Sequence, residues 1–243
     1  MAEIDHTIWK SESVVAYYLE RKDSRPFIQE QIGVMMRLVK DLGRPVRRFM
    51  DLGCGDGILA AIILDNYQDA TAILADHSAP MLEAASAKLQ GLSRSTHFCN
   101  VDYSRPDWTK AVAEHSPFDL VVSGFSIHHQ PDERKIPIYS EIFDMLASGG
   151  MFINLEHVAS PTKPIAELWD RIRIDSLRDL AVKRGLNKSR ATIEKEYFER
   201  PDREANLFSL VETQCEWLRK IGYVDVDCFF KYFELAIFGG RRP

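Results

Sequence analysis

Long apolar runs are absent from this chain of 243 residues. None of its apolar stretches approaches the roughly 20 residues that a membrane-spanning helix needs. The segment MAEIDHTIWK, with which the sequence begins, also lacks the basic and then apolar layout of a secretory signal peptide. We therefore expect a cytoplasmic protein with no membrane partner.

Cysteine is scarce, and its spacing gives no sign of a metal site. The four residues are Cys54, Cys99, Cys215 and Cys228. They form no CxxC pair and stand at no zinc-ligand spacing from a histidine. We expect reduced thiols and no bound metal. Cys54 lies within a glycine-rich loop that requires small side chains, so packing explains it better than reactivity.

A surplus of basic residues is missing too. The formal net charge is −5 at pH 7, which argues against broad binding to nucleic acid or to membrane surfaces. The composition is otherwise ordinary for a globular protein, with 45% hydrophobic and 28% charged residues. A chain of this length fits one α/β domain with a large core, or a domain with a modest insertion.

From residue 46 onward, short apolar strands alternate with helices. Strands are expected at 46–52, 71–75, 97–101, 118–123 and 151–155, and helices at 58–64, after Ser78, and at 136–146, where Gly149 and Gly150 close the last one. Continuously apolar strands separated by helices indicate a parallel sheet covered on both faces. The sequence therefore predicts a doubly wound, Rossmann-like α/β fold that binds its ligand at the carboxyl ends of the strands.

The flanking segments complete a single predicted domain over residues 1–243. Residues 11–42 are expected to form N-terminal helices, residues 46–158 and 207–240 the core, and residues 159–206 a charged helical insertion that serves as a lid. Ser209 and Glu212 have the spacing of a capping box that starts another helix. Residues 224–228 and 233–238 are expected to pair as an antiparallel hairpin.

The glycine loop Asp51-Leu52-Gly53-Cys54-Gly55-Asp56-Gly57 follows the first strand and opens a helix. Glycine lets the backbone turn sharply and approach a ligand closely. The spacing is Gly-x-Gly-x-Gly with Ile58 next, so it is not the GxGxxG of an NAD site. A carboxylate at Asp51 would repel a pyrophosphate but suits a ligand with an ammonium and a sulfonium group, such as S-adenosylmethionine (SAM).

Two further acids follow at strand ends. Asp76 ends the second strand at the distance where such folds place an acid on ribose hydroxyls, and His77 and Met81 are placed to flank the adenine. Asp102 ends the third strand, where an acid can accept from the adenine amino group, with Tyr103 beside it. The ordinary alternatives are a helix-capping aspartate and a surface acid, and we favour ligand binding for both.

The ends of the fourth and fifth strands carry the candidates for catalysis. Ser123 is expected to contact the methionine part of SAM. His128 and His129 face the place of a methyl acceptor, where a histidine can take or orient a hydroxyl proton, although capping the loop is the more ordinary role of each alone. Glu156 and His157 end the fifth strand on the same side and are candidates for positioning a substrate.

These motifs, in this order, resemble class I SAM-dependent methyltransferases over most of residues 11–239. DLGCGDG is similar to that family's first motif, and ADHSAPML, the segment around Asp102, FDLVVSGFSIHH and LASGGMFINLEH are similar to its successors. The resemblance implies a seven-stranded sheet whose last strand is antiparallel, with SAM as the cofactor. We expect SAM to be bound by Asp51, Gly53, Cys54, Gly55, Asp76, His77, Met81, Asp102, Tyr103 and Ser123.

Within the family, the helical segment around Tyr17 and the stretch 209–223 are most similar to small-molecule methyltransferases and carboxy-SAM synthases. The synthases need an arginine in the C-terminal helix for the extra carboxylate, and Trp217 occupies the matching place. Enzymes that methylate amino groups of nucleic-acid bases carry an Asn/Asp-Pro-Pro-Tyr segment, and residues 123–126 read Ser-Gly-Phe-Ser instead. Both departures favour ordinary methyl transfer to a small molecule.

The combined prediction is an enzyme that moves the methyl group of SAM to an oxygen, nitrogen or carbon atom of a small-molecule acceptor. The alternatives are a carboxy-SAM synthase or tRNA-modification enzyme, an NAD-dependent oxidoreductase, and a SAM-binding protein without turnover. The basic cluster Lys183, Arg184, Lys188 and Arg190 is better explained as a solvated helix face than as an anion site. The sequence leaves the acceptor unnamed and the oligomeric state open, with a homodimer as one option.

Overall fold

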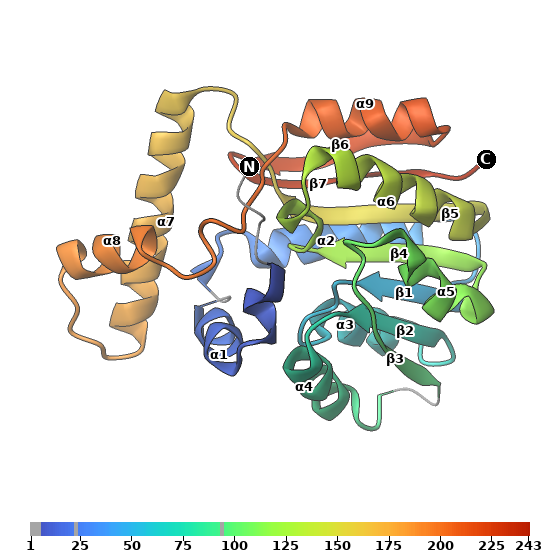
Figure 1. The fold of residues 1–243 in the computed structure, drawn as a ribbon, viewed down its shortest axis with the longest axis horizontal. Helices are drawn as coiled ribbons and strands as arrows, with labels where there is room; N and C mark the ends of the chain where they lie inside the picture. Colours follow the sequence, from blue (N-terminus) through green and yellow to red (C-terminus); the bar gives the residue numbers. More distant parts are fainter. Residues whose placement is uncertain (1–5, 22–23, 93–94) are drawn as a thin grey trace.

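A seven-stranded sheet organises the structure, which is a computed structural model describing residues 6–21, 24–92 and 95–243. The strand order is β3-β2-β1-β4-β5-β7-β6 (Figure 1). The strands are β1 Arg48–Leu52, β2 Thr71–Asp76, β3 Thr96–Asn100, β4 Phe118–Gly124, β5 Leu146–His157, β6 Val224–Tyr232 and β7 Leu235–Arg241. Strands β1 to β5 pair in parallel, and β7 is antiparallel to both of its neighbours. The predicted mostly parallel sheet and its antiparallel last strand are confirmed.

Helices cover both faces of the sheet, as a doubly wound fold requires. One face packs against α2 (Ile28–Lys40), α3 (Ile58–Asn66) and α4 (Ala79–Leu89), and the other against α5 (Thr109–Val112), α6 (Asp132–Met145) and α9 (Val211–Ile221). Successive side chains along each strand point to opposite faces and so contribute to two hydrophobic cores, one on each face of the sheet: Phe49 of β1 packs in the first and Met50 in the second. Both side chains have no exposed surface.

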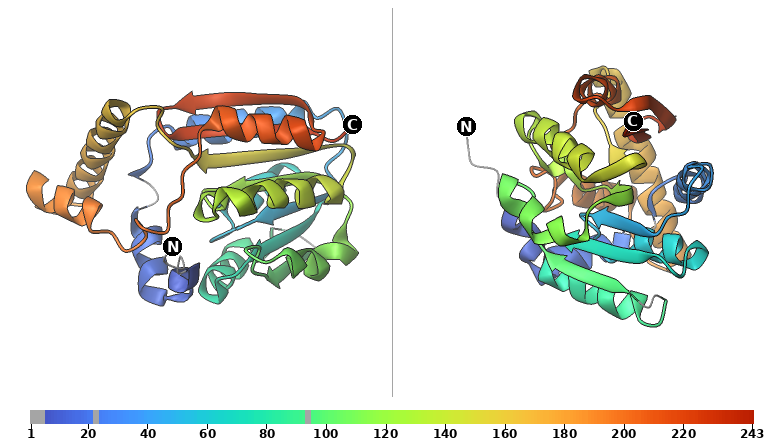
Figure 2. Two further views of the ribbon diagram at one scale, coloured as in Figure 1. Left: turned by 45° about the horizontal axis from the view of Figure 1, so that its top comes forward. Right: turned by 90° about the vertical axis from the view of Figure 1, so that its right-hand side faces the viewer.

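The segment after β5 leaves the sheet and forms α7 (Lys163–Lys183) and α8 (Arg190–Phe198). Figures 1 and 2 show these helices projecting beyond the carboxyl ends of the parallel strands, on the side of α1 (Glu12–Arg21). Contacts tie them to the N-terminal segment: Arg21 pairs with Glu196 at 3.4 Å, and Arg173 donates to the Ser24 carbonyl at 2.7 Å. The helical segments before β1 and after β5 therefore meet above the strand ends. Two residues of the helical span predicted at 11–42, residues 22–23, lie outside the described residues.

Two local predictions are wrong, and packing explains both. Ser209 does not cap α9, whose N-cap is Leu210, because the Ser209 hydroxyl instead bonds Asp132 and Lys135 of α6. Gly149 and Gly150 do not close α6 either; they lie within β5, next to a register shift between β4 and β5. A Cβ at Gly150 would come within 2.9 Å of the Phe118 carbonyl oxygen, so a close strand approach requires this glycine.

No helix in the described part of the chain is long and apolar enough to cross a membrane. The same residues contain no group of three or more histidine, cysteine or acidic side chains arranged to hold a metal ion. The described residues also leave all four cysteines as free thiols.

Candidate functional site

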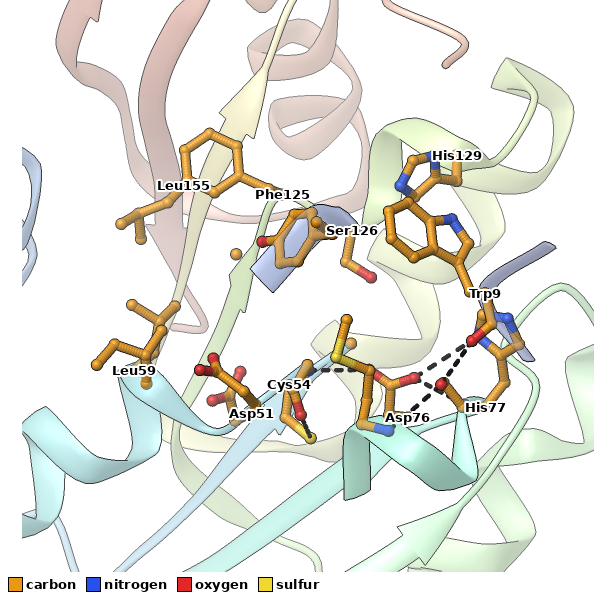
Figure 3. Close-up of a pocket in the computed structure, with 18 of the residues that line it drawn as sticks. Trp9, Asp51, Cys54, Leu59, Asp76, His77, Phe125, Ser126, His129 and Leu155 are labelled. Carbon is orange, nitrogen blue, oxygen red and sulfur yellow. Dashed lines mark hydrogen bonds and ion pairs between the residues drawn. The ribbon is translucent and has the colours of Figure 1, made fainter. Parts of the chain in front are cut away.

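A cavity of about 220 Å³ lies at the carboxyl ends of β1, β2 and β4, where the fold predicts a ligand. Nine of the ten residues predicted to hold a cofactor line it: Asp51, Gly53, Cys54, Gly55, Asp76, His77, Met81, Asp102 and Tyr103. Figure 3 shows Asp51, Cys54 and Asp76 on one side of this cavity, with Phe125 and Ser126 opposite. Ser123 is the exception, because its buried hydroxyl donates to the Leu52 carbonyl at 2.8 Å and ties β4 to β1.

The glycine loop forms the floor of the cavity. Gly53 and Cys54 donate their backbone N–H groups to the Ala75 carbonyl at 2.7 and 3.2 Å, which fixes the loop to the end of β2. Gly53 has a φ of 66°, a conformation that residues with a side chain rarely adopt. A Cβ at this position would lie 1.8 Å from the Ser126 hydroxyl oxygen. The loop therefore needs glycine at position 53 for both its turn and its close approach to the segment after β4.

Asp51 is a buried carboxyl group with an unsatisfied oxygen. Asp51 is 1% exposed, and its Oδ2 accepts a hydrogen bond from the Ala60 N–H at 3.1 Å. Its Oδ1 has no hydrogen-bond partner among the described residues. Burial raises the pKa of Asp51 to about 7, and the neighbouring Asp76 and Asp56 add to the rise. Such a group would be stabilised by a cationic ligand in the cavity that it lines.

Asp76 holds the loop and the start of the next helix together. Its Oδ2 accepts from the Gly55 N–H and its Oδ1 from the Ser78 N–H, both at 2.9 Å. Burial raises the pKa of Asp76, and these two backbone hydrogen bonds oppose the rise. Ser78 caps α4 as predicted, accepting from the Met81 N–H at 3.4 Å. Asp76 therefore combines the structural role of an anchor with a position on the cavity wall.

Asp102 and Tyr103 differ in their exposure. Asp102 is exposed and accepts from the Ser104 N–H at 3.0 Å; hydrogen bonds from Ser104 outweigh partial burial and lower its pKa. Tyr103 is buried, donates to the Ser126 carbonyl at 3.1 Å, and has its pKa raised by burial. Burial also raises the pKa of the Cys54 thiol well above its usual value, which fits the expected packing role.

Several lining residues were not predicted from the sequence. Trp9 lies in the short 3-10 helix η1 (His6–Lys10), and its carbonyl accepts from the Ser78 hydroxyl at 2.6 Å. Figure 3 shows its indole beside His129, with ring centroids 5.1 Å apart. Phe125, Ser126 and Leu155 also line the cavity. The apolar spacing of the first helices pointed to packing, and nothing in it marked Trp9 as a wall of the site.

A second cavity, of about 260 Å³, lies between the first and the helices α7 and α8. The two cavities share a wall made of Trp9, Tyr18, Arg25, Phe125 and His129. His128 and His157 line only the second cavity, and Glu156 is fully buried behind them. His128, His129 and His157 therefore all line the second cavity.

His128 is held at both ring nitrogens. Its Nδ1 bonds the Glu156 carboxylate, and its Nε2 lies 2.9 Å from the side-chain Oδ1 of Asn206. The Asn206 amide nitrogen donates to the Asp202 carbonyl, so its oxygen is the atom that faces His128. Both ring nitrogens thus point at acceptors, and Glu156 also accepts the His128 N–H at 3.1 Å. Both ring nitrogens are therefore occupied by protein partners, and neither is left to contact a substrate.

His129 is arranged differently. Its Nδ1 lies 3.0 Å from the Ala205 carbonyl oxygen, which only accepts, so Nδ1 carries the proton. A neutral ring then has its lone pair on Nε2. His129 lies on the wall between the two cavities, whereas His128 does not. Of the two sequence candidates, His129 is therefore the one that faces both cavities.

Comparisons with known proteins agree with the fold and the loop. Residues 49–150 match a family described as "Methyltransferase domain". The chain is 23% identical over 216 residues to a carboxy-S-adenosyl-L-methionine synthase from a Nitratiruptor species, covering 88% of this chain and 84% of that protein. It is 26% identical over 195 residues to the protein of the same name from Aeromonas salmonicida, covering 79% of this chain and 74% of that one.

Solved structures share the fold at low sequence identity. An O-methyltransferase family protein from Burkholderia thailandensis aligns with a TM-score of 0.69 and 13% identity, covering 100% of this chain and 64% of that one. Magnesium protoporphyrin IX methyltransferase from Synechocystis PCC 6803, with bound SAH, aligns with a TM-score of 0.63 and 16% identity, covering 99% and 98% of the two chains. These likenesses show that the sheet and its helices have the arrangement found in methyltransferases.

Proposed function

We propose that this class I SAM-dependent methyltransferase transfers the methyl group of SAM to a small-molecule acceptor held beneath α7 and α8. The observation that carries the proposal is the pair of cavities with one shared wall. One lies on the glycine loop, where a nucleoside-like ligand docks, and the other is of small-molecule size. A donor and an acceptor in adjoining cavities meet at the wall between them.

The first cavity fits SAM in its chemistry. The Oδ1 of buried Asp51 has no hydrogen-bond partner among the described residues, so a nearby cation would stabilise the carboxylate. SAM carries two cationic groups, an ammonium and a sulfonium. Asp76 and Asp102 stand at the ends of the next two strands, where carboxylates can accept hydroxyl and amino protons of a nucleoside. Because Gly53 has no Cβ, the loop can lie close to Ser126; any side chain at position 53 would clash with the Ser126 hydroxyl. We propose these residues, with Gly55, His77, Met81 and Tyr103, as the SAM site.

When bound, SAM supplies an electrophilic methyl group on a positively charged sulfur. The protein's task is to hold the acceptor atom in line with that methyl group and to exclude water, because a dry site favours a transfer that neutralises charge. His129, on the wall between the two cavities, is the residue we propose to take the acceptor's proton if the acceptor atom is a hydroxyl or amine. His128 and Glu156 hold the loop that carries His129, through the contact of Glu156 with the His128 backbone N–H.

The proposal is tested with methyl-labelled SAM and a metabolite extract. We expect the label to appear in one compound of the small-molecule fraction, in a reaction that depends on the protein. Label found only in protein or RNA would contradict a small-molecule acceptor. No label in any fraction, together with tight SAM binding, would favour a SAM-binding protein without turnover.

A second candidate function is suggested by the two relatives named as carboxy-S-adenosyl-L-methionine synthases, which match most of the chain. Trp217 stands where the resemblance to that branch expects an arginine, and it is half-buried against the core cluster of α6 and α9. It does not line either cavity. Mass spectrometry of the ligand that co-purifies with the protein decides between the two: a carboxylated sulfonium would contradict ordinary methyl transfer.

Three finer expectations stay predictions. The division into N-terminal helices, core and lid within one domain is proposed on the contacts of α7 with Ser24 and of α8 with α1. A cytoplasmic location is proposed on the sequence alone. A homodimer remains one option for the oligomeric state, which size-exclusion chromatography with light scattering would measure directly.

A further inference from the structure

The second cavity is rich in arginine. Five arginine side chains line it, against three carboxylates. This surplus of positive charge stands out in a chain whose formal net charge is −5. A positively charged wall inside an acidic protein focuses its field on whatever enters the cavity.

Arg173 of α7 is the most enclosed of these cations. The residue is 9% exposed, and its guanidinium donates to the Ser24 carbonyl at 2.7 Å and to the Ser24 hydroxyl at 3.1 Å. In the part of the chain that the structure describes, no carboxylate forms an ion pair with it. Burial lowers the pKa of Arg173 to about 10, and the nearby Arg25 adds to the decrease, so the group stays charged at neutral pH. A buried charge without a counterion is costly unless a ligand supplies one.

The carboxylates that line the cavity are already engaged or partly uncharged. Asp170 accepts from the Tyr197 hydroxyl at 2.7 Å, and Asp202 lies 3.7 Å from Arg200. Glu234 accepts from the Ser160 hydroxyl at 2.7 Å, and burial raises its pKa to about 7. None of the three makes an ion pair with Arg173 among the described residues. Asp202 therefore offsets Arg200 and Glu196 offsets Arg21, whereas Arg173 keeps its charge without a carboxylate partner among the described residues.

His157 responds to the same field. Its pKa is lowered well below the usual value, first by burial and then by His128, Arg25, Arg173 and Arg200. Its Nε2 is buried and has no hydrogen-bond partner among the described residues. The cavity therefore presents a neutral imidazole beside guanidinium groups that have spare donors, which is an arrangement that accepts an oxyanion.

The rest of the wall is aromatic. Trp169 is 1% exposed and meets the His157 ring edge to face at 6.0 Å. Phe208 meets the same imidazole at 5.4 Å. Flat apolar walls on either side of a charged group suit a ligand with an unsaturated or ring-shaped body.

The two ends of the cavity differ. Arg173 and Arg200 line the second cavity alone, whereas Phe125 and His129 also face the first. A ligand whose charged group pairs with the two arginines therefore extends its other end toward the wall where methyl transfer is proposed. The arginines would fix its orientation, since guanidinium groups bind carboxylate and phosphate oxygens in a fixed geometry.

We propose that the methyl acceptor is an organic oxyanion, with a carboxylate or phosphate bound by Arg173 and Arg200 and an apolar, ring-bearing body that places the reacting atom beside Phe125 and His129. This inference rests on the proposed function, because it assigns the substrate class of the same site. It assigns the two arginines as specificity-determining residues rather than catalytic ones.

The first test sorts a metabolite extract by charge before the reaction. The extract is passed over an anion-exchange resin at pH 7.5, and the retained and unretained fractions are each incubated with the protein and methyl-labelled SAM. We expect label only with the retained fraction. Label in a compound from the unretained fraction would overturn the anionic acceptor while leaving methyl transfer to a small molecule intact. No labelled small molecule from either fraction would contradict the proposed function itself, and with it this inference.

The second test uses variants on the compound that gains the label. Arg173→Gln and Arg200→Gln should each raise its KM by about ten- to hundredfold, the cost of losing a charge-assisted hydrogen bond, with kcat changed far less. Arg173→Lys should restore part of the loss. The affinity for SAM should not change, because neither residue lines the first cavity.

Arg178→Gln, an exposed position on the same helix, is the matched control and should leave KM unchanged. Because Arg173 also ties α7 to Ser24, Arg200→Gln keeps the test valid if the Arg173 variant folds poorly. Unchanged KM in the Arg200 variant would overturn the assignment. A rise in KM accompanied by an equal loss of affinity for SAM would indicate a structural role, and it would overturn the assignment as well.

Discussion

Replacing Asp51 by asparagine should make the stability of the protein depend less on pH. Burial raises the pKa of Asp51 to about 7 in the folded protein, whereas an aspartate in an unfolded chain has a pKa of about 3.9. The folded state therefore favours the protonated carboxyl. That contribution to stability is fully present below the unfolded pKa and is lost as pH rises through about 7.

The size of the effect follows from the two pKa values. The proton held by Asp51 stabilises the wild type by roughly 2–3 kcal/mol more at pH 5 than at pH 8, at about 1.4 kcal/mol for each pKa unit. Asparagine cannot titrate, so Asp51→Asn should lose less stability over this range. The difference in unfolding free energy between variant and wild type should then shift by roughly 2–3 kcal/mol in favour of the variant.

Urea unfolding at pH 5 and pH 8, without SAM, measures this difference. Asp69→Asn, at an exposed position, is the matched control. A difference between Asp51→Asn and wild type that is the same at both pH values would refute the reasoning. It would mean that Asp51 is ionised in the folded protein without a cation beside it.

Three further predictions follow from the site. SAM affinity of the wild type should increase between pH 6 and pH 8, because a bound cation favours ionised Asp51, and calorimetry in Asp51→Asn should find this dependence weakened. Gly53→Ala should lower the free energy of unfolding by at least about 1–2 kcal/mol, because the Gly53 φ is 66° and the new Cβ would clash with Ser126. Gly33→Ala is the control: Gly33 lies in α2, a Cβ added there would meet no atom within 4 Å, and the variant should not be destabilised. His129→Ala should lower kcat about a hundredfold or more with SAM affinity kept, and unchanged turnover would leave His129 a structural residue.

The sequence predicted the parts of the site that are local. The loop from Asp51 to Gly57 and the acid at Asp76 follow directly from strand ends, and parallel strands bring their carboxyl ends to one edge of the sheet. Apolar runs located β1 to β4 to within two residues, whereas β5 begins at Leu146, five residues before the predicted start at 151. Such features need no knowledge of contacts between distant segments.

Features that depend on distant partners were not predictable in the same way. Trp9 reaches the site because its carbonyl binds Ser78, 69 residues later in the chain. Ser209 has the sequence of a helix cap, yet the buried Lys135 and the exposed Asp132 of α6 bind its hydroxyl instead. His128 and His129 have the same sequence context, and only the positions of Asn206 and Ala205 distinguish their ring nitrogens.

The most direct test of the central claim, SAM bound on the glycine loop beside Asp76, is a calorimetric titration of wild type and Asp76→Ala. We predict one SAM site per chain, no binding of NAD, and an affinity for SAM that falls by about 1–3 kcal/mol in the variant. Asp69→Ala, at an exposed position, should bind SAM as the wild type does. An unchanged affinity in a folded Asp76→Ala variant, or binding of NAD in place of SAM, would contradict the account.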